Sequence, residues 1–102
     1  MSAVIRLERN AAAEIWRVSD EVRWRLWDGE AVAYNGRTGD THHFADFAAW
    51  VFGRLCVAPA SCRSLARDAE DSVELRAGGA VGETITRTLA LLQRLQIVEA
   101  VA

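Results

Sequence analysis

The sequence predicts a small α+β domain with a winged-helix-like order, in which a three-stranded antiparallel sheet is followed by three helices. Two observations predict it. Residues 22–44 hold three short strand-like runs separated by tight-turn signals, and from residue 46 the hydrophobic period changes from that of a strand to that of a helix. The length of 102 residues fits one domain whose core needs neither metal nor disulfide.

The chain divides into a short N-terminal segment and one folded domain. Residues 4–7 (VIRL) could form a short strand, but residues 10–14 (NAAAE) are a run of small residues. We therefore expect a loosely ordered arm at residues 1–14 and the domain at residues 15–102. No apolar run approaches the roughly 20 residues that span a bilayer, and the N-terminus lacks the apolar segment of a signal peptide. We therefore expect a cytoplasmic protein that does not bind a membrane.

The first predicted hairpin covers residues 22–35. Residues 22–27 (VRWRLW) alternate in polarity, which is typical of a half-buried strand. Asp28-Gly29 is a strong two-residue turn signal, so this strand should pair antiparallel with residues 31–35. The side chains expected to face the core are those of Val22, Trp24 and Leu26.

A second turn and a third strand follow. Residues 35–40 (NGRTGD) tolerate positive φ and local side-chain hydrogen bonds, so the chain reverses there and residues 41–44 return along the second strand. This third strand is predicted to lie at an edge of the sheet. Its unpaired N–H and C=O groups would then be a template for strand addition.

Three helices are predicted after the sheet. The first begins near Asp46, which either caps it or lies in its first turn, and its inward face is Phe47, Trp50, Val51 and Leu55. Pro59 ends this helix region, and Ser61 is the expected N-cap of a second helix over residues 62–69. The third helix covers residues 82–95 with its core stripe at Ile85, Leu89 and Leu92, and residues 97–101 are a candidate terminal strand.

The four tryptophans divide between core and surface. Trp24 and Trp50 are expected in the core. Trp27 lies on the outer face of its strand beside Arg23 and Arg25, which suits either a partner surface or a position covered by the N-terminal arm.

Two short motifs carry a resemblance to a known family. Residues 27–30 (WDGE) and residues 39–42 (GDTH), followed by the serine-capped helix and the third helix, resemble the PqqD family over about residues 15–100. More narrowly, they are similar to the branch found beside HPr-kinase-related proteins, the HPr-rel-A system.

The resemblance implies a non-catalytic peptide chaperone or adaptor, a recognition element for ribosomally made precursor peptides. Such a domain binds the leader of the precursor by strand addition to the strand at residues 41–44, beside the third helix. It then presents the peptide to a modifying enzyme or, in this branch, to an HPr-kinase-related protein.

The third helix is more apolar than one core stripe requires. A second line, Thr84, Thr88, Leu91 and Leu95, runs beside the first, which suits a helix that also forms the wall of a groove. A dimer contact or a broad core face would explain the same pattern. Arg87 and Arg94 border this line. The candidate peptide-binding residues are therefore Thr41, His42, His43, Phe44, Thr84, Arg87, Thr88, Leu91, Arg94 and Leu95.

The remaining reactive residues predict no catalytic, cofactor or metal site. His42 and His43 are adjacent on a strand and should face opposite sides, which disfavours one shared metal ion. Cys56 and Cys62 lack the second pair of a zinc site and are expected to be free thiols. We find neither a nucleophile–base arrangement nor a phosphate-binding loop, so no enzymatic activity is expected.

A winged-helix DNA-binding regulator is the alternative function. Its third helix would enter the major groove, yet the residues that it exposes there are only Glu83, Arg87, Gln93 and Arg94. The net charge of −2 and the pI of about 5.6 also disfavour nucleic acid as a partner. Finally, an open strand edge beside a wide apolar helix predicts self-association as a homodimer.

Overall fold

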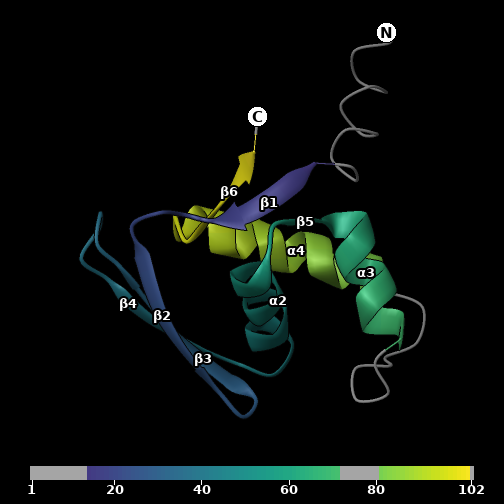
Figure 1. The fold of residues 1–102 in the computed structure, drawn as a ribbon, viewed down its shortest axis with the longest axis horizontal. Helices are drawn as coiled ribbons and strands as arrows, with labels where there is room; N and C mark the ends of the chain where they lie inside the picture. The colour runs from purple at the N-terminus through teal and green to yellow at the C-terminus, as the bar shows by residue number, and fades with distance from the viewer. Residues whose placement is uncertain (1–13, 72–80, 102) are drawn as a thin grey trace, which may run out of the picture.

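The computed structural model describes residues 14–71 and 81–101 (Figure 1). Residues 1–13, which make up nearly all of the predicted arm, lie outside that description. Within the described residues the strands are β1 (Ile15–Val18), β2 (Val22–Trp27), β3 (Glu30–Asn35), β4 (Thr41–Ala45), β5 (Ala60–Ser61) and β6 (Val98–Val101). The helices are α2 (Asp46–Val57), α3 (Cys62–Asp71) and α4 (Val81–Arg94).

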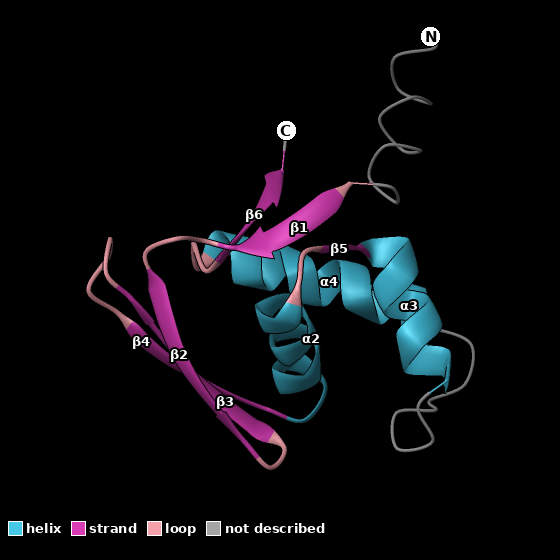
Figure 2. Ribbon diagram, in the orientation of Figure 1, coloured by secondary structure: helices cyan, strands magenta, loops and turns pink. Residues whose placement is uncertain are grey.

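The predicted three-stranded antiparallel sheet is confirmed, and we name it sheet B. Its order is β2-β3-β4, with Trp27 opposite Glu30 in the first hairpin and Tyr34 opposite Thr41 in the second. Figure 2 shows the strands of this sheet beside α2, with the other two helices beyond it. The α+β, winged-helix-like fold class is therefore correct.

The chain enters α2 directly from β4, without a linker. Asp46 has a φ of 56°, and its N–H donates to the carbonyl oxygen of Gly29 at 3.1 Å. Ala45 occupies the N-cap position with extended backbone, and no side chain caps the helix. Asp46 therefore lies in the first turn, where its carboxylate suits the positive end of the helix dipole.

A second sheet, sheet A, was not predicted. Its order is β5-β1-β6, with β1 antiparallel to both neighbours. The candidate terminal strand is confirmed as β6, and its partner is β1, which lies almost a whole chain length away in sequence. Sheet A adds Trp16, Ala60 and Val98 to the core.

The buried face of α2 is rotated from the prediction. Phe52 is fully buried and contacts Phe44 with ring centroids 5.7 Å apart, whereas Trp50 and Phe47 are half-buried and stack on each other. Val51 and Leu55 are buried as predicted.

Helix α2 packs mainly on β3 and β4, so the residues of β2 after Val22 stay exposed. The prediction that Trp24 and Leu26 are core residues is therefore wrong. Their exposed fractions are 45% and 42%, and Trp24 makes an edge-on contact with Phe52 of α2.

The other two helices agree with the sequence. The Ser61 hydroxyl accepts a hydrogen bond from the Ser64 N–H at 3.0 Å, which confirms the N-cap of α3. Ile85, Leu89 and Leu92 of α4 are buried. None of the described helices is long and apolar enough to cross a membrane.

Candidate functional site

The edge of β4 forms the first side of the candidate site. Among the described residues β4 pairs with β3 alone, so along its outer edge alternate backbone N–H and C=O groups have no strand partner. On the inner face Phe44 is buried and His42 is half-buried, with the two rings stacked 6.4 Å apart. Phe44 thus supports the core, and His42 is the inward side chain that a ligand at this edge could reach.

His43 and Thr41 lie on the outer face of β4. The His43 Nε2 atom is 2.8 Å from the Glu30 Oε1 atom across the sheet, and its ring stacks on Trp27 with centroids 6.5 Å apart. Trp27 is nonetheless 47% exposed. The two histidines therefore point to opposite faces and have different neighbours.

Helix α4 forms the second side. Leu91 is 43% exposed, and Leu95 is half-buried against the core. The Thr88 hydroxyl donates to the Thr84 carbonyl oxygen at 2.9 Å, which leaves its methyl group as the apolar part of the line. Arg94 is exposed in the last turn, and no described carboxylate forms an ion pair with it.

Asn35 joins these two sides, a role that sequence reasoning missed. Its side-chain Nδ2 donates to the Gln96 carbonyl oxygen at 2.8 Å and lies 3.5 Å from that of Leu95. Its backbone N–H donates to the Asp40 carbonyl oxygen at 2.9 Å, immediately before β4. The start of β4 is therefore held beside the C-terminal end of α4.

A sequence signal for this role did exist. The last carbonyl groups of a helix have no N–H donor within the helix. The side-chain NH₂ group of an asparagine in a nearby turn can donate to them, while its side-chain oxygen accepts a backbone N–H of the turn. The Asn35 Oδ1 atom does accept from the Arg37 N–H, at 2.8 Å.

The predicted residues consequently fall into two groups. Leu91 and Leu95 lie at the end of α4 that Asn35 holds near β4. Arg87 lies about one turn before Leu91 and Thr84 about two turns before it, with Thr84 about 16 Å from Leu95 along the helix axis. Arg87 also faces Glu83 in an ion pair of 3.7 Å. The arginine that borders the β4 end is Arg94.

The far flank of α4 is occupied. The Thr86 hydroxyl is 3.4 Å from the Cys62 Sγ atom at the start of α3, and Leu91 lies about 140° around the helix from Thr86. Leu91 therefore faces away from α3. This geometry favours the Leu91 side as the one that a ligand could reach.

The thiol of Cys56 is partly buried. Burial raises the pKa of the Cys56 thiol to about 12, so the nucleophilic thiolate is scarce at neutral pH. Both cysteines are free thiols.

Comparisons with known proteins identify a fold rather than a family. No protein-family model and no curated protein matches the chain. Among solved structures, the fold is similar to that of TbiB1 in complex with the TbiA(β) leader peptide, with a TM-score of 0.68 and 20% sequence identity. The match covers 84% of this chain and 98% of the TbiB1 chain.

Proposed function

We propose that this chain is a non-catalytic peptide-binding adaptor that holds the leader of a ribosomally made precursor peptide. The observation that carries the proposal is the open edge of β4, whose start Asn35 holds to the C-terminal end of α4, the end that carries the exposed Leu91. The shared fold with TbiB1, which was solved with a leader peptide bound, supports it. So does the resemblance of residues 27–30 and 39–42 to the PqqD family.

The leader adds to β4 as an antiparallel strand in this proposal. Backbone hydrogen bonds to the strand edge are independent of sequence, so selectivity comes from side chains that enter the space between β4 and α4. Burying one leucine-sized side chain against Leu91 and Leu95 contributes roughly 1.5–3 kcal/mol. Arg94 at the border favours an acidic or amide-rich leader, and an exposed contact of this kind contributes about 0.2–1 kcal/mol.

The adaptor then presents the precursor to a modifying enzyme or an HPr-kinase-related protein in the cytoplasm. These partners, and membership of the HPr-rel-A branch, are part of the proposal and rest on the resemblance alone. Genes that neighbour this one should encode both the precursor and the enzyme that modifies it.

Two substitutions on α4 test the groove. Leu91→Asp places a charge on the apolar wall and should weaken leader binding by at least tenfold, because the lost burial is worth more than one exposed ion pair. Arg94→Ala should weaken it less than about fivefold. The measurement is calorimetric titration of the precursor peptide encoded beside this gene.

The fold should survive both changes, because the buried residues Ile85, Leu89 and Leu92 still fill the core. Circular dichroism of each variant is the control. Equal affinity of the wild type and Leu91→Asp would exclude this groove. Retention of the wild type on duplex DNA at low salt, with no peptide binding, would favour the DNA-binding alternative.

A further inference from the structure

The opposite edge of sheet B is also open. Every residue of β2 from Arg23 to Trp27 is exposed, and among the described residues β2 pairs with β3 alone. Proteins usually protect such edges with a covering helix or with short, charged strands. The outer edge of β2 has no strand partner among the described residues, so β2 presents alternate unpaired backbone groups from Arg23 to Trp27. We call this stretch the β2 edge.

The inner row of the β2 edge is apolar. Trp24 and Leu26 retain 45% and 42% of their exposed surface. The Leu26 Cδ1 atom lies beside Gly53 of α2, 3.8 Å from where a β-carbon at that glycine would lie. An apolar side chain from an added strand would therefore find partners on this side of the sheet.

The outer row of the β2 edge holds two arginines, Arg23 and Arg25, followed by Trp27. Arg23 and Arg25 form no ion pair with the described residues, and two acidic residues near them have other partners. Glu21 bonds to Arg37, and Glu30 bonds to His43. Both guanidinium groups are therefore available to a ligand, with Asp20 and Glu21 beside Arg23 at one end of the row.

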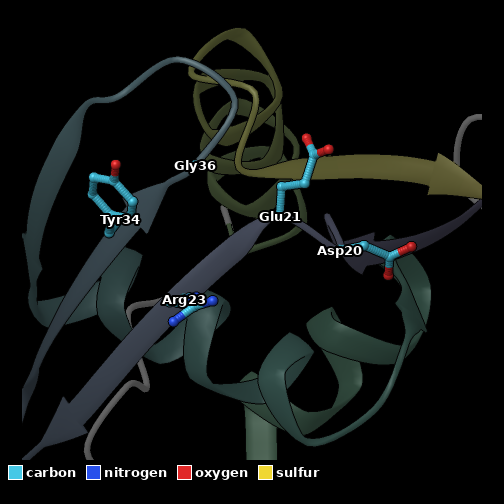
Figure 3. Close-up of a pocket in the computed structure, with 5 residues that line it drawn as sticks. All are labelled: Asp20, Glu21, Arg23, Tyr34 and Gly36. Atoms are coloured by element: carbon cyan, nitrogen blue, oxygen red, sulfur yellow. The ribbon is translucent and has the colours of Figure 1, made fainter.

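The outer row ends at a shallow hollow. Its volume is about 480 Å³, and it lies where the turn after β1 meets the turn after β3 (Figure 3). The lining residues are Asp20, Glu21, Arg23, Tyr34 and Gly36. A bound strand that runs past Arg23 would have room for a bulky side chain at this end.

We propose that the β2 edge docks an extended segment of a partner protein in which acidic and apolar residues alternate. Because side chains of an added strand alternate between faces, its acidic residues would lie beside Arg23 and Arg25 and its apolar residues beside Trp24 and Leu26. The β4 edge suits a different segment, since its outer row is Thr41, His43 and Ala45, and His43 is paired. Sheet B thus offers two edges with different preferences.

Charge excludes two other occupants. A second copy paired through its own β2 would set one arginine row against another on the same face, which is repulsive. The chain's own residues 4–9 (VIRLER) carry two arginines and one glutamate, so they also fail to balance the row. A partner segment with alternating acidic and apolar residues complements both the arginine row and the apolar row.

A synthetic peptide tests the proposal. The probe alternates glutamate with valine over about eight residues, the length of an ordinary strand. Binding is measured by fluorescence anisotropy, and its location by hydrogen exchange of backbone amides in NMR spectra. We expect slower exchange in β2, with β4 unchanged.

Matched double variants test the charge. Arg23→Glu with Arg25→Glu should weaken the probe by about tenfold or more. Arg63→Glu with Arg67→Glu makes the same change of net charge on exposed positions of α3 and should leave the affinity within about twofold. A probe with lysine in place of glutamate should not bind the wild type, which decides the question even if the first variant does not fold.

Several outcomes would overturn the proposal: no binding of the glutamate probe, protection at β4 instead of β2, or equal loss in the two double variants. A control peptide has the same composition, with its glutamates in one block and its valines in another. If it binds equally well, the alternating order is not what the β2 edge recognises, and the proposal fails. Protection of β2 that rises with protein concentration alone would identify a second copy as the occupant.

Discussion

Asn35 connects parts of the molecule that are distant in sequence. Its exposed fraction is 1%, and its amide group serves the turn after β3 through one atom and the end of α4 through the other. The helix itself ends with Gln96 in the left-handed region at a φ of 62°, while the Ile97 N–H donates to the Leu92 carbonyl oxygen at 3.0 Å. The neighbouring backbone thus satisfies some carbonyl groups at this helix end, and Asn35 satisfies the Gln96 carbonyl group that follows it.

Replacing this residue should destabilise the fold. Asn35→Ala removes the donor to Gln96 and the acceptor for the turn, at a cost of about 1–3 kcal/mol in the free energy of unfolding. Asn35→Asp keeps the acceptor but sets a carboxylate against carbonyl oxygens, so it should cost at least as much. Urea unfolding followed by circular dichroism is the measurement.

Thr38→Ala is the matched control in the same turn. It removes only the exposed bond from the Asp40 N–H to the Thr38 hydroxyl and should change the free energy of unfolding by less than about 0.5 kcal/mol. If Asn35→Ala unfolds at the same urea concentration as this control, the bridge contributes nothing to stability.

At the scale of elements, α2 shows what hydrophobic spacing can and cannot predict. The period located the helix and its first residue, because alternation gives way to helical spacing at Asp46. It did not fix the rotation of the helix, since Phe47, Trp50 and Phe52 spread aromatic rings around more than one face. Only the packing partners, Phe44 and the small residues of β3, decide that Phe52 points inward.

Two alanine substitutions on α2 test this rotation. Phe52→Ala should lower the free energy of unfolding by about 3–5 kcal/mol, because it leaves a cavity between α2 and sheet B. Trp50→Ala should cost clearly less, since that side chain is only half-buried. Thermal and urea unfolding of both variants give the comparison. A larger loss for Trp50→Ala would favour the face predicted from the sequence.

The distinction between local and distant contacts also explains which parts of the candidate site could be predicted from the sequence. Turn residues and alternation suffice to predict that β4 ends a three-stranded meander, because those signals lie within one stretch of chain. The exposure of Trp24 could not be predicted, because it depends on how much of the sheet one helix covers. Sheet A was missed because the partner of β1 lies at the opposite end of the described chain.

At the scale of the whole molecule, we expect a homodimer at high concentration. The β4 edge and the exposed Leu91 would be shared between two copies, so the dimer and the leader would compete for one surface. Sedimentation velocity should show a dimer near millimolar concentration that dissociates when leader peptide is added. Leu91→Asp should shift the protein to monomer, and Thr86→Asp on the other flank is the control. A wild-type monomer at every concentration would contradict this prediction.

The pairing of β1 with β6 has a consequence for the order of folding. Ile15 lies opposite Val101 and Val18 opposite Val98, so this ladder closes a loop of almost the entire chain. The hairpins of sheet B need only turns of a few residues, and closing a long loop costs more chain entropy before any contact compensates it. We therefore expect sheet B with α2 to form early on the folding pathway, and the closure of β1 on β6 to be a late step that brings Trp16 into a core already half assembled.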